Sequence, residues 1–357
     1  MISPGSRKHF RAERGAWLTR LYWFSLGAAI LLAAAPIPAS AQGTPLKVAS
    51  LEITSDAGIY VAIEKGYFRQ EGITVELSPF NTASRQILPL VQGSLDIGGG
   101  AVAAALFNAV AEMEEPIRIV SEKGSGFKDR SASALAVRKD LMDSGRVKDF
   151  KDFKGLTVAV SSFASAPHIE LLRGLGTAGL TEKDIRIIEL SFPNMATAFA
   201  NKAIDAAMFQ EPLTTMSAEQ GISVRWKLAY DLYPNHTVGV VLYSPQVVKN
   251  RPEEARRYMV AYLRGVRDYN DAFMHGKGKS EMVGILTRYT RVKDAKIYDK
   301  MVPSGLSGNG TVNRDGIAYD QEWYFQRGQV KKKVNIDKLV DESFLQYALS
   351  RIGRVPD

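Results

Sequence analysis

Short apolar stretches are separated by amphipathic stretches in the first part of the chain. They predict three strands: one at residues 46–54 that runs into a polar turn, one at 73–77 with alternating apolar residues, and one at 94–101 that ends in a glycine run. Apolar positions three and four residues apart predict two helices between them, one over 58–68 with Ile59, Ala62 and Ile63 inward and one carrying Ile87, Leu90 and Val91. We expect side chains of residues 81–84 to cap the second helix and Gly93 to end it. Strands that alternate with short helices predict βαβ units and a mostly parallel sheet.

The same order of elements returns later in the chain. Strands are predicted at residues 156–160, 185–190 and 204–209, separated by a helix carrying Ile169, Leu172 and Leu175 and by a short helix over 195–200. Val48 precedes Asp96 by 48 residues, and Val158 precedes Asp205 by 47. This repeat predicts an α/β fold of two similar α/β lobes.

Two connections between the lobes are predicted. A strand at residues 134–137 leads into the second lobe, after a strand at 117–120 and a flexible turn at 123–126, and a strand at 238–243 returns to the first. We therefore predict lobe 1 at residues 42–132 plus 239–357, lobe 2 at residues 133–238, and hinge segments near 131–137 and 233–240. Two crossings form a hinged clamp, and the cleft between two lobes is a favoured ligand site.

The C-terminal third is predicted to be helical. Pro252 opens a long helix whose inner face carries Tyr258, Met259, Tyr262, Leu263, Val266 and Phe273. The residues beyond it are expected to be helical apart from a loop at 304–310, and to pack against the first lobe.

Residues 1–41 differ in pattern from the rest of the chain. Five basic residues precede or flank an apolar segment over 21–35, and Ala39-Ser40-Ala41 has the form of a cleavage site. This pattern predicts a secretory signal peptide over residues 1–41. The alternative is an uncleaved anchor, but the apolar segment is short for a full span of about 20 residues and prolines interrupt its end. We therefore expect export to the periplasm or the medium.

The composition of the chain excludes several kinds of partner and site. Residues 1–41 carry five basic residues and one acidic residue, so their removal lowers the formal net charge from +8 to +4. That mild charge does not favour a nucleic-acid partner. The chain contains no cysteine, which excludes disulfides, thiolate metal sites and a lipidated N-terminal cysteine. Three scattered histidines remain after residue 41, with no metal-ligand spacing, so we expect no metal and no cofactor.

Polar residues and bare backbone follow the predicted strands, and we expect them at one cleft. The carboxyl ends of parallel strands meet at one edge of a sheet, where ligands bind in open α/β folds. The candidates for ligand contact in the first lobe are Thr54, Ser55, Asn81, Thr82, Gly100 and Ala101. Asp56 is interpreted as a helix cap. If it faces the cleft instead, its charge opposes an anion and favours an amine or N–H donor. The glycines before Ala101 either let a ligand approach the main chain or only permit tight helix–strand packing.

The second lobe supplies the opposite wall. Ser161 and Ser162 lie where a strand turns into a helix, and unpaired N–H groups there favour an anion, although the serines could instead only cap the helix. Phe163 offers an aromatic surface, and His168 is near enough to line the cleft. Glu211 follows a strand and is either a ligand contact or an acid at a helix start.

Several segments resemble one known family. They are residues 58–75, 93–98, 153–160 and 204–207, Glu211-Pro212, and residues 339–349 near the C-terminus. Together they resemble the periplasmic substrate-binding proteins of ABC importers for nitrate, sulfonates such as taurine, and thiamine pyrimidine precursors. The resemblance implies a type II periplasmic-binding-protein fold that closes on one small ligand, and it places family ligand positions on the loops after the strands.

The resemblance also implies partners and an absence of catalysis. The expected partners are a small-molecule ligand and the permease and ATPase subunits of an ABC transporter, with the receptor itself a monomer. The pyrimidine-making enzymes related to this family carry a cysteine-rich motif, which this chain lacks, so we expect no catalytic residues. The favoured ligand is a small organic anion, a sulfonate or carboxylate. A pyrimidine precursor or another aromatic compound, an enzyme on the same scaffold and a sensor domain are the alternatives.

Overall fold

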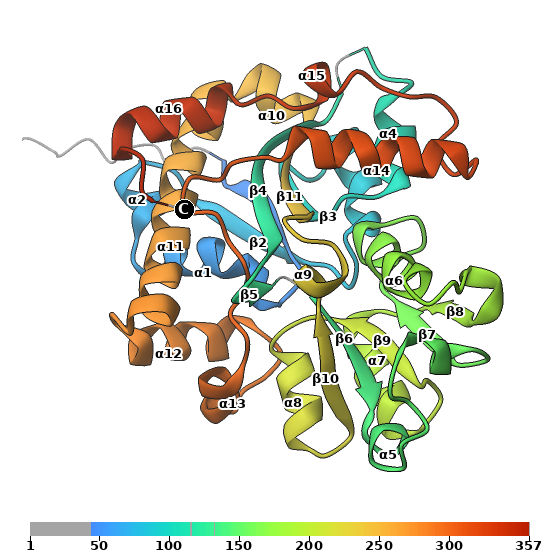
Figure 1. Ribbon diagram of the computed structural model, residues 1–357. Helices are drawn as coiled ribbons and strands as arrows, with labels where there is room; N and C mark the ends of the chain where they lie inside the picture. The colour runs from blue at the N-terminus through green and yellow to red at the C-terminus, as the bar shows by residue number, and fades with distance from the viewer. Residues whose placement is uncertain (1–43, 115, 132, 357) are drawn as a thin grey trace, which may run out of the picture. The chain divides into compact units, whose positions relative to one another are not determined.

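The computed structural model describes residues 44–114, 116–131 and 133–356. Its strands form two sheets (Figure 1). The first contains β1 (Leu46–Ser50), β2 (Val75–Pro79), β3 (Ile97–Ala101), β4 (Arg118–Phe127), β5 (Arg130–Ser131) and β11 (Thr237–Tyr243). The second contains β6 (Ala134–Arg138), β7 (Thr157–Val160), β8 (Arg186–Glu189), β9 (Ala206–Phe209) and β10 (Ser223–Leu228). The predicted signal peptide lies outside the described residues.

The two sheets repeat one strand order. In the first sheet the order is β2-β1-β3-β11-β4-β5, with β1 parallel to both β2 and β3 and β11 antiparallel to β3. In the second the order is β10-β6-β9-β7-β8, with β7 parallel to both β8 and β9 and β6 antiparallel to β9. Each parallel triplet therefore meets an antiparallel strand that begins just after a crossing between the sheets. The predicted two-lobed α/β fold is confirmed, whereas the exact lobe boundaries stay a prediction.

The helices follow the predicted order. Between β1 and β10 they are α1 (Ala57–Glu64), α2 (Tyr67–Gln70), α3 (Ile87–Gln92), α4 (Ala104–Val110), α5 (Lys139–Asp143), α6 (Ala166–Gly176), α7 (Phe192–Ala200) and α8 (Leu213–Glu219). After β10 come α9 (Ala229–Leu232), α10 (Pro245–Asn250), α11 (Pro252–His275), α12 (Lys279–Tyr289), α13 (Ala295–Lys300), α14 (Arg314–Gln326), α15 (Ile336–Leu339) and α16 (Ser343–Ile352). None of the described helices is long and apolar enough to cross a membrane.

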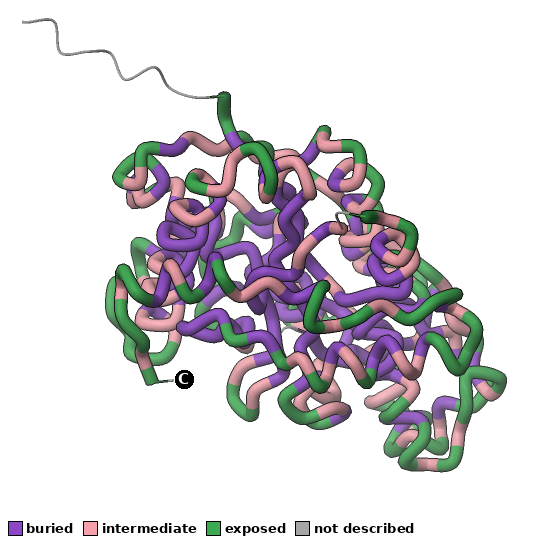
Figure 2. The backbone as a smooth tube through the Cα atoms, turned by 90° about the horizontal axis from the view of Figure 1, so that it is seen from above, coloured by how far each residue is buried: buried purple, intermediate pink, exposed green. Residues whose placement is uncertain are grey.

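Helix α11 ties the C-terminal third to the first sheet's helices. It runs beside α1 and contacts α2 and α16 (Figure 1). Its predicted inner residues from Tyr258 to Val266 are buried. The α1–α11 contact is close because two glycines face each other: a Cβ built on Gly265 would overlap the carbonyl oxygen of Gly58. In Figure 2, buried segments lie in the middle of the molecule and exposed segments lie mostly in the turns at its periphery.

Three local predictions were wrong. Residues 58–68 form two helices, because Gly66 adopts φ 70°, a left-handed conformation that ends α1. No side chain of residues 81–84 caps α3; a 3-10 turn over Ser84–Gln86 precedes it instead. The predicted flexible turn at 123–126 lies inside β4 and is buried, since this strand pairs with β11 along its length.

Candidate functional site

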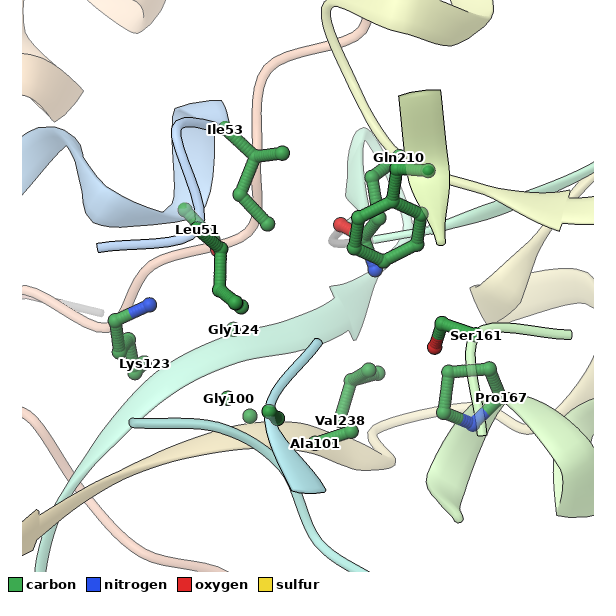
Figure 3. Close-up of a pocket in the computed structure, with 14 residues that line it drawn as sticks. Leu51, Ile53, Gly100, Ala101, Lys123, Gly124, Ser161, Pro167, Gln210 and Val238 are labelled. Carbon is green, nitrogen blue, oxygen red and sulfur yellow. The ribbon is translucent and has the colours of Figure 1, made fainter. Parts of the chain in front are cut away.

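A cavity of about 30 Å³ lies at the carboxyl ends of strands from both sheets. Figure 3 shows its lining residues converging from the two sides. They are Leu51, Ile53, Ser55, Ala83, Gly100, Ala101, Lys123, Gly124, Ser161, Pro167, Phe192, Gln210, Val238 and Gly239. Leu51, Gly100, Ser161 and Gln210 lie at or just beyond the ends of β1, β3, β7 and β9. The cavity therefore sits where the topology of an open α/β sheet places a ligand.

The structure brings some of the candidate residues to this cavity and directs others elsewhere. Ser55, Gly100, Ala101 and Ser161 line it. The remaining candidates are not among its lining residues: Thr54, Asn81, Thr82, Ser162, Phe163, His168 and Glu211. A contact between any of these residues and a ligand stays a prediction.

Some of the candidates that do not line the cavity join the two lobes directly. Thr54 donates its backbone N–H and its hydroxyl to the carbonyl oxygen of Glu211, at 3.2 and 3.1 Å. The hydroxyls of Ser84 and Ser162 are 2.8 Å apart. These bonds link loops that follow strands of different sheets, so the polar residues at the strand ends hold the loops together around the cavity.

The Glu211 carboxylate has partners within its own lobe. It accepts hydrogen bonds from the backbone N–H and the hydroxyl of Thr215, both at 3.0 Å, and forms an ion pair with Arg225 at 2.7 Å. Of the two roles considered from the sequence, these contacts are those of an acid at the start of α8.

His168 packs beside the cavity wall in a neutral form. Its Nδ1 accepts the N–H of Ala164 at 3.1 Å, and its ring makes edge contacts with Phe163 and Trp323. Burial and, to a smaller extent, the charge of Arg327 lower its pKa to about 4. Phe163 itself is exposed. Asn81 is also exposed and accepts a hydrogen bond from Arg291 at 3.2 Å.

The start of α6 offers fewer free donors than expected. The N–H of Ala166 binds the carbonyl of Val102 at 2.8 Å, and the N–H of His168 binds that of Ser165 at 2.9 Å. Pro167, between them, has no N–H. The N–H groups of Ala166 and His168 are therefore paired, whereas anion binding by the turn at Ser161 and Ser162 stays a prediction.

The glycine run of β3 makes room for side chains of the protein itself. A Cβ on Gly99 would lie 2.7 Å from Cδ of Lys123, and one on Gly98 would lie 2.8 Å from a methyl of Leu90. Gly100 borders the cavity and leaves room for Ala83. Tight packing therefore explains Gly98 and Gly99, whereas Gly100 exposes backbone to the cavity.

A buried ion pair at the cavity was missed in the sequence. Lys123, from the middle of β4, pairs through Nζ with Oδ1 of Asp56, and both side chains are at most 2% exposed. The other carboxylate oxygen of Asp56 accepts hydrogen bonds from the N–H of Leu51 at 2.6 Å and the hydroxyl of Tyr60 at 3.0 Å. The predicted cap by Asp56 is absent. The sequence pattern does not indicate that Lys123 is buried at the cavity, because glycines follow it and β4 is buried on both faces.

Within the described residues no group of three or more histidines, aspartates and glutamates could hold a metal ion. The site is therefore made of hydroxyls, one amide, one lysine–aspartate pair and apolar side chains. Hydrogen-bonding groups, charge and apolar side chains are what small-molecule sites are made of. The cavity of about 30 Å³ is smaller than an organic ligand, so binding one requires the walls to move apart.

Two sheets of one strand order, with a cavity between the carboxyl ends of their strands, define the type II periplasmic-binding-protein fold. The chain belongs to the family described as NMT1/THI5 like, whose family model matches residues 53–272. The family resemblance predicted from the sequence is thereby confirmed.

One relative comes from Bacillus subtilis (strain 168) and bears the name "Putative aliphatic sulfonates-binding protein". It is 25% identical to this chain over 304 residues, which cover 82% of this chain and 84% of the relative.

Solved structures share the fold. The periplasmic nitrate-binding protein NrtA from Synechocystis PCC 6803 superposes with a TM-score of 0.72 at 16% identity, covering 87% of this chain and 89% of that one. The periplasmic aliphatic sulphonate binding protein SsuA from Escherichia coli gives 0.63 at 19% identity, covering 85% and 99%. The desulfurization enzyme DSZB gives 0.61 at 16% identity, covering 86% and 99%. The fold is thus shared by binding proteins and an enzyme.

Proposed function

We propose that this protein is the periplasmic solute-binding receptor of an ABC importer. It captures a small organic anion, a sulfonate or carboxylate, between its two lobes and delivers it to the permease. The observation that carries the proposal is the cavity, because residues after strands of both sheets line it together. The sulfonate-binding name of the Bacillus subtilis relative supports the ligand class.

Capture follows from the position of the cavity. A ligand that touches Ser55 on one side and Ser161 on the other binds the closed arrangement better than an open one, so it shifts the population towards closure. The predicted hinge segments, near 131–137 and 233–240, connect the two sheets and would absorb the motion. The closed form then docks on the permease.

The chemistry of the lining suits one polar end and one apolar end. Ser55, Ser161 and Gln210 offer hydrogen-bond donors, and Ile53 and Phe192 offer apolar surface. A sulfonate or carboxylate on a short hydrocarbon body uses both. Phe192 would also stack on a ring, so an aromatic acid or a pyrimidine precursor is the second candidate. We propose no catalytic role, and the name of the Bacillus subtilis relative supports binding.

A thermal-shift screen of the purified protein tests this proposal. The panel contains taurine, alkyl and aryl sulfonates, nitrate, aromatic carboxylates, pyrimidine precursors and riboflavin. A ligand present at about 100 times its dissociation constant adds roughly 2.7 kcal/mol to the free energy of unfolding, a readily visible shift. A shift with a sulfonate or carboxylate supports the proposal. A shift with only uncharged compounds contradicts the ligand class, and consumption of the added compound contradicts the receptor role.

A further inference from the structure

Lys123 is the one charged side chain among the residues that line the cavity. It projects from the middle of β4, its hydrocarbon stem crosses Gly99, and the residue is only 3% exposed. Its nitrogen lies on the Leu51 side of the cavity in Figure 3. A positive charge buried to this degree is costly unless an anion lies beside it. Asp56 provides that anion.

The ion pair with Asp56 leaves part of the hydrogen-bonding capacity of Lys123 unused. Oδ2 of Asp56 already accepts from Leu51, from Tyr60 and, at 3.3 Å, from the hydroxyl of Ser50. Only Oδ1 faces the ammonium group. An ammonium group has three N–H donors, and Nζ of Lys123 has no hydrogen-bond acceptor that meets normal geometry among the described residues. The lysine is thus fixed in place with donors left for another partner.

We propose that Nζ of Lys123 binds an anionic oxygen of the ligand and selects sulfonates and carboxylates over uncharged compounds. Asp56 acts as a positioning residue that holds the ammonium group in place through the ion pair. This inference rests on the proposed function and names the residue that sets its ligand class. Without a ligand the pair is electrically neutral, and the ligand's charge meets donors that are already in place. Preorganised donors lose little freedom when the ligand binds.

Two matched pairs of compounds test the effect of the ligand's charge on its affinity. Methanesulfonate and dimethyl sulfone have nearly the same shape, as do benzenesulfonate and methyl phenyl sulfone, and only the sulfonate of each pair is an anion. Isothermal titration calorimetry of the wild-type protein should show the sulfonate binding about 10–100-fold more tightly than its sulfone, the range expected for one hydrogen bond to a charged group. Equal affinities overturn the proposal without any variant.

The variant K123M/D56N removes both members of the ion pair together. It leaves no unpaired buried charge, so it is expected to fold, whereas K123M alone strands the carboxylate of Asp56. The double variant should bind sulfonate and sulfone equally. K128M is the matched control, because Lys128 is exposed in the turn after β4 and does not line the cavity; it should keep the wild-type preference.

The outcomes distinguish a failure of the proposed role of Lys123 from a failure of the proposed ligand class. If the double variant keeps the preference for sulfonate, Lys123 is not the selecting residue, although the receptor function stands. If wild-type protein binds neither sulfonate and no carboxylate of the panel, the proposed ligand class fails, and the role of Lys123 fails with it.

Discussion

Replacing His236 with glutamine should strongly destabilise the protein. Nδ1 of His236 lies 3.0 Å from Oε1 of Glu170, and Nε2 lies 2.9 Å from Oδ2 of Asp320; all three side chains are at most 1% exposed. Glu170 belongs to α6, Asp320 to α14, and His236 to the segment just before β11. The cluster therefore joins the second lobe, a crossing segment and the C-terminal third.

The pKa of His236 gives the direction and the size of its contribution to stability at different pH values. Burial lowers this pKa, but the charges and hydrogen bonds of Asp320 and Glu170 outweigh burial and raise it from 6.5 to about 9. Because the folded protein holds this proton more tightly than the unfolded chain, the stabilisation is complete below about pH 6.5 and is lost as the pH rises through about 9. A shift of this size corresponds to about 3 kcal/mol. Removing the cation from two buried carboxylates costs about 3–5 kcal/mol.

Urea unfolding at several pH values between 6 and 10 is the assay. At pH 7, H236Q should unfold with a free energy about 3–5 kcal/mol below that of the wild-type protein, and its loss of stability above pH 6.5 should be smaller. The triple variant E170Q/H236Q/D320N removes the unpaired charges and should recover most of the loss. H275Q is the control, because His275 is exposed at the end of α11. An H236Q protein within about 1 kcal/mol of wild type, with an unchanged pH profile, would refute the reasoning.

Three further predictions follow from packing, burial and the site. G265A should lower the free energy of unfolding by about 1–3 kcal/mol because its Cβ would overlap Gly58. G284A in α12 should raise it by up to about 1 kcal/mol, because a Cβ there makes only an ordinary contact with Nη1 of Arg288 at 3.8 Å. Equal effects in urea unfolding would contradict the close contact. S161A should weaken ligand binding by about 3–10-fold, the loss of one neutral hydrogen bond, and unchanged affinity by calorimetry would remove Ser161 from the site. Burial raises the pKa of Glu122 to about 7, so the free energy of unfolding should fall as the pH rises from about 4.5 to 7. E122Q should flatten that part of the pH profile, and an unaltered profile would be inconsistent with this assignment.

The fold could be predicted because its pattern is periodic. Short strands with alternating or continuous apolar residues, separated by helices, determine the parallel triplets of both sheets, and the matching spacing of Val48–Asp96 and Val158–Asp205 indicates the repeat. The full length of β4 was harder to recognise. The strand predicted at 117–120 continues to Phe127, but glycines at 124 and 126 imitate a turn, and only the pairing with β11 shows that the strand goes on.

The candidate site could be predicted to within a loop but not to a residue. Sheet topology places the ends of β1 and β7 at the cavity, yet Ser55 and Ser161 line it while their neighbours Thr54 and Ser162 bind across to other loops. Which neighbour faces inward depends on the turn's backbone angles, which composition does not specify. Lys123 lies in the part of β4 that the sequence pattern assigns to a turn, and tertiary pairing brings its charge to Asp56.

Ligand-dependent closure tests the central claim most directly. The chain has no cysteine, so K183C and K331C place two spin labels at exposed positions of the second lobe and of the C-terminal third without background labelling. Electron–electron distance measurements on the doubly labelled protein should show a broader distribution without ligand and one shorter, narrower distance with a saturating sulfonate or carboxylate. An identical distance distribution with and without a compound that calorimetry shows to bind would contradict capture between the lobes.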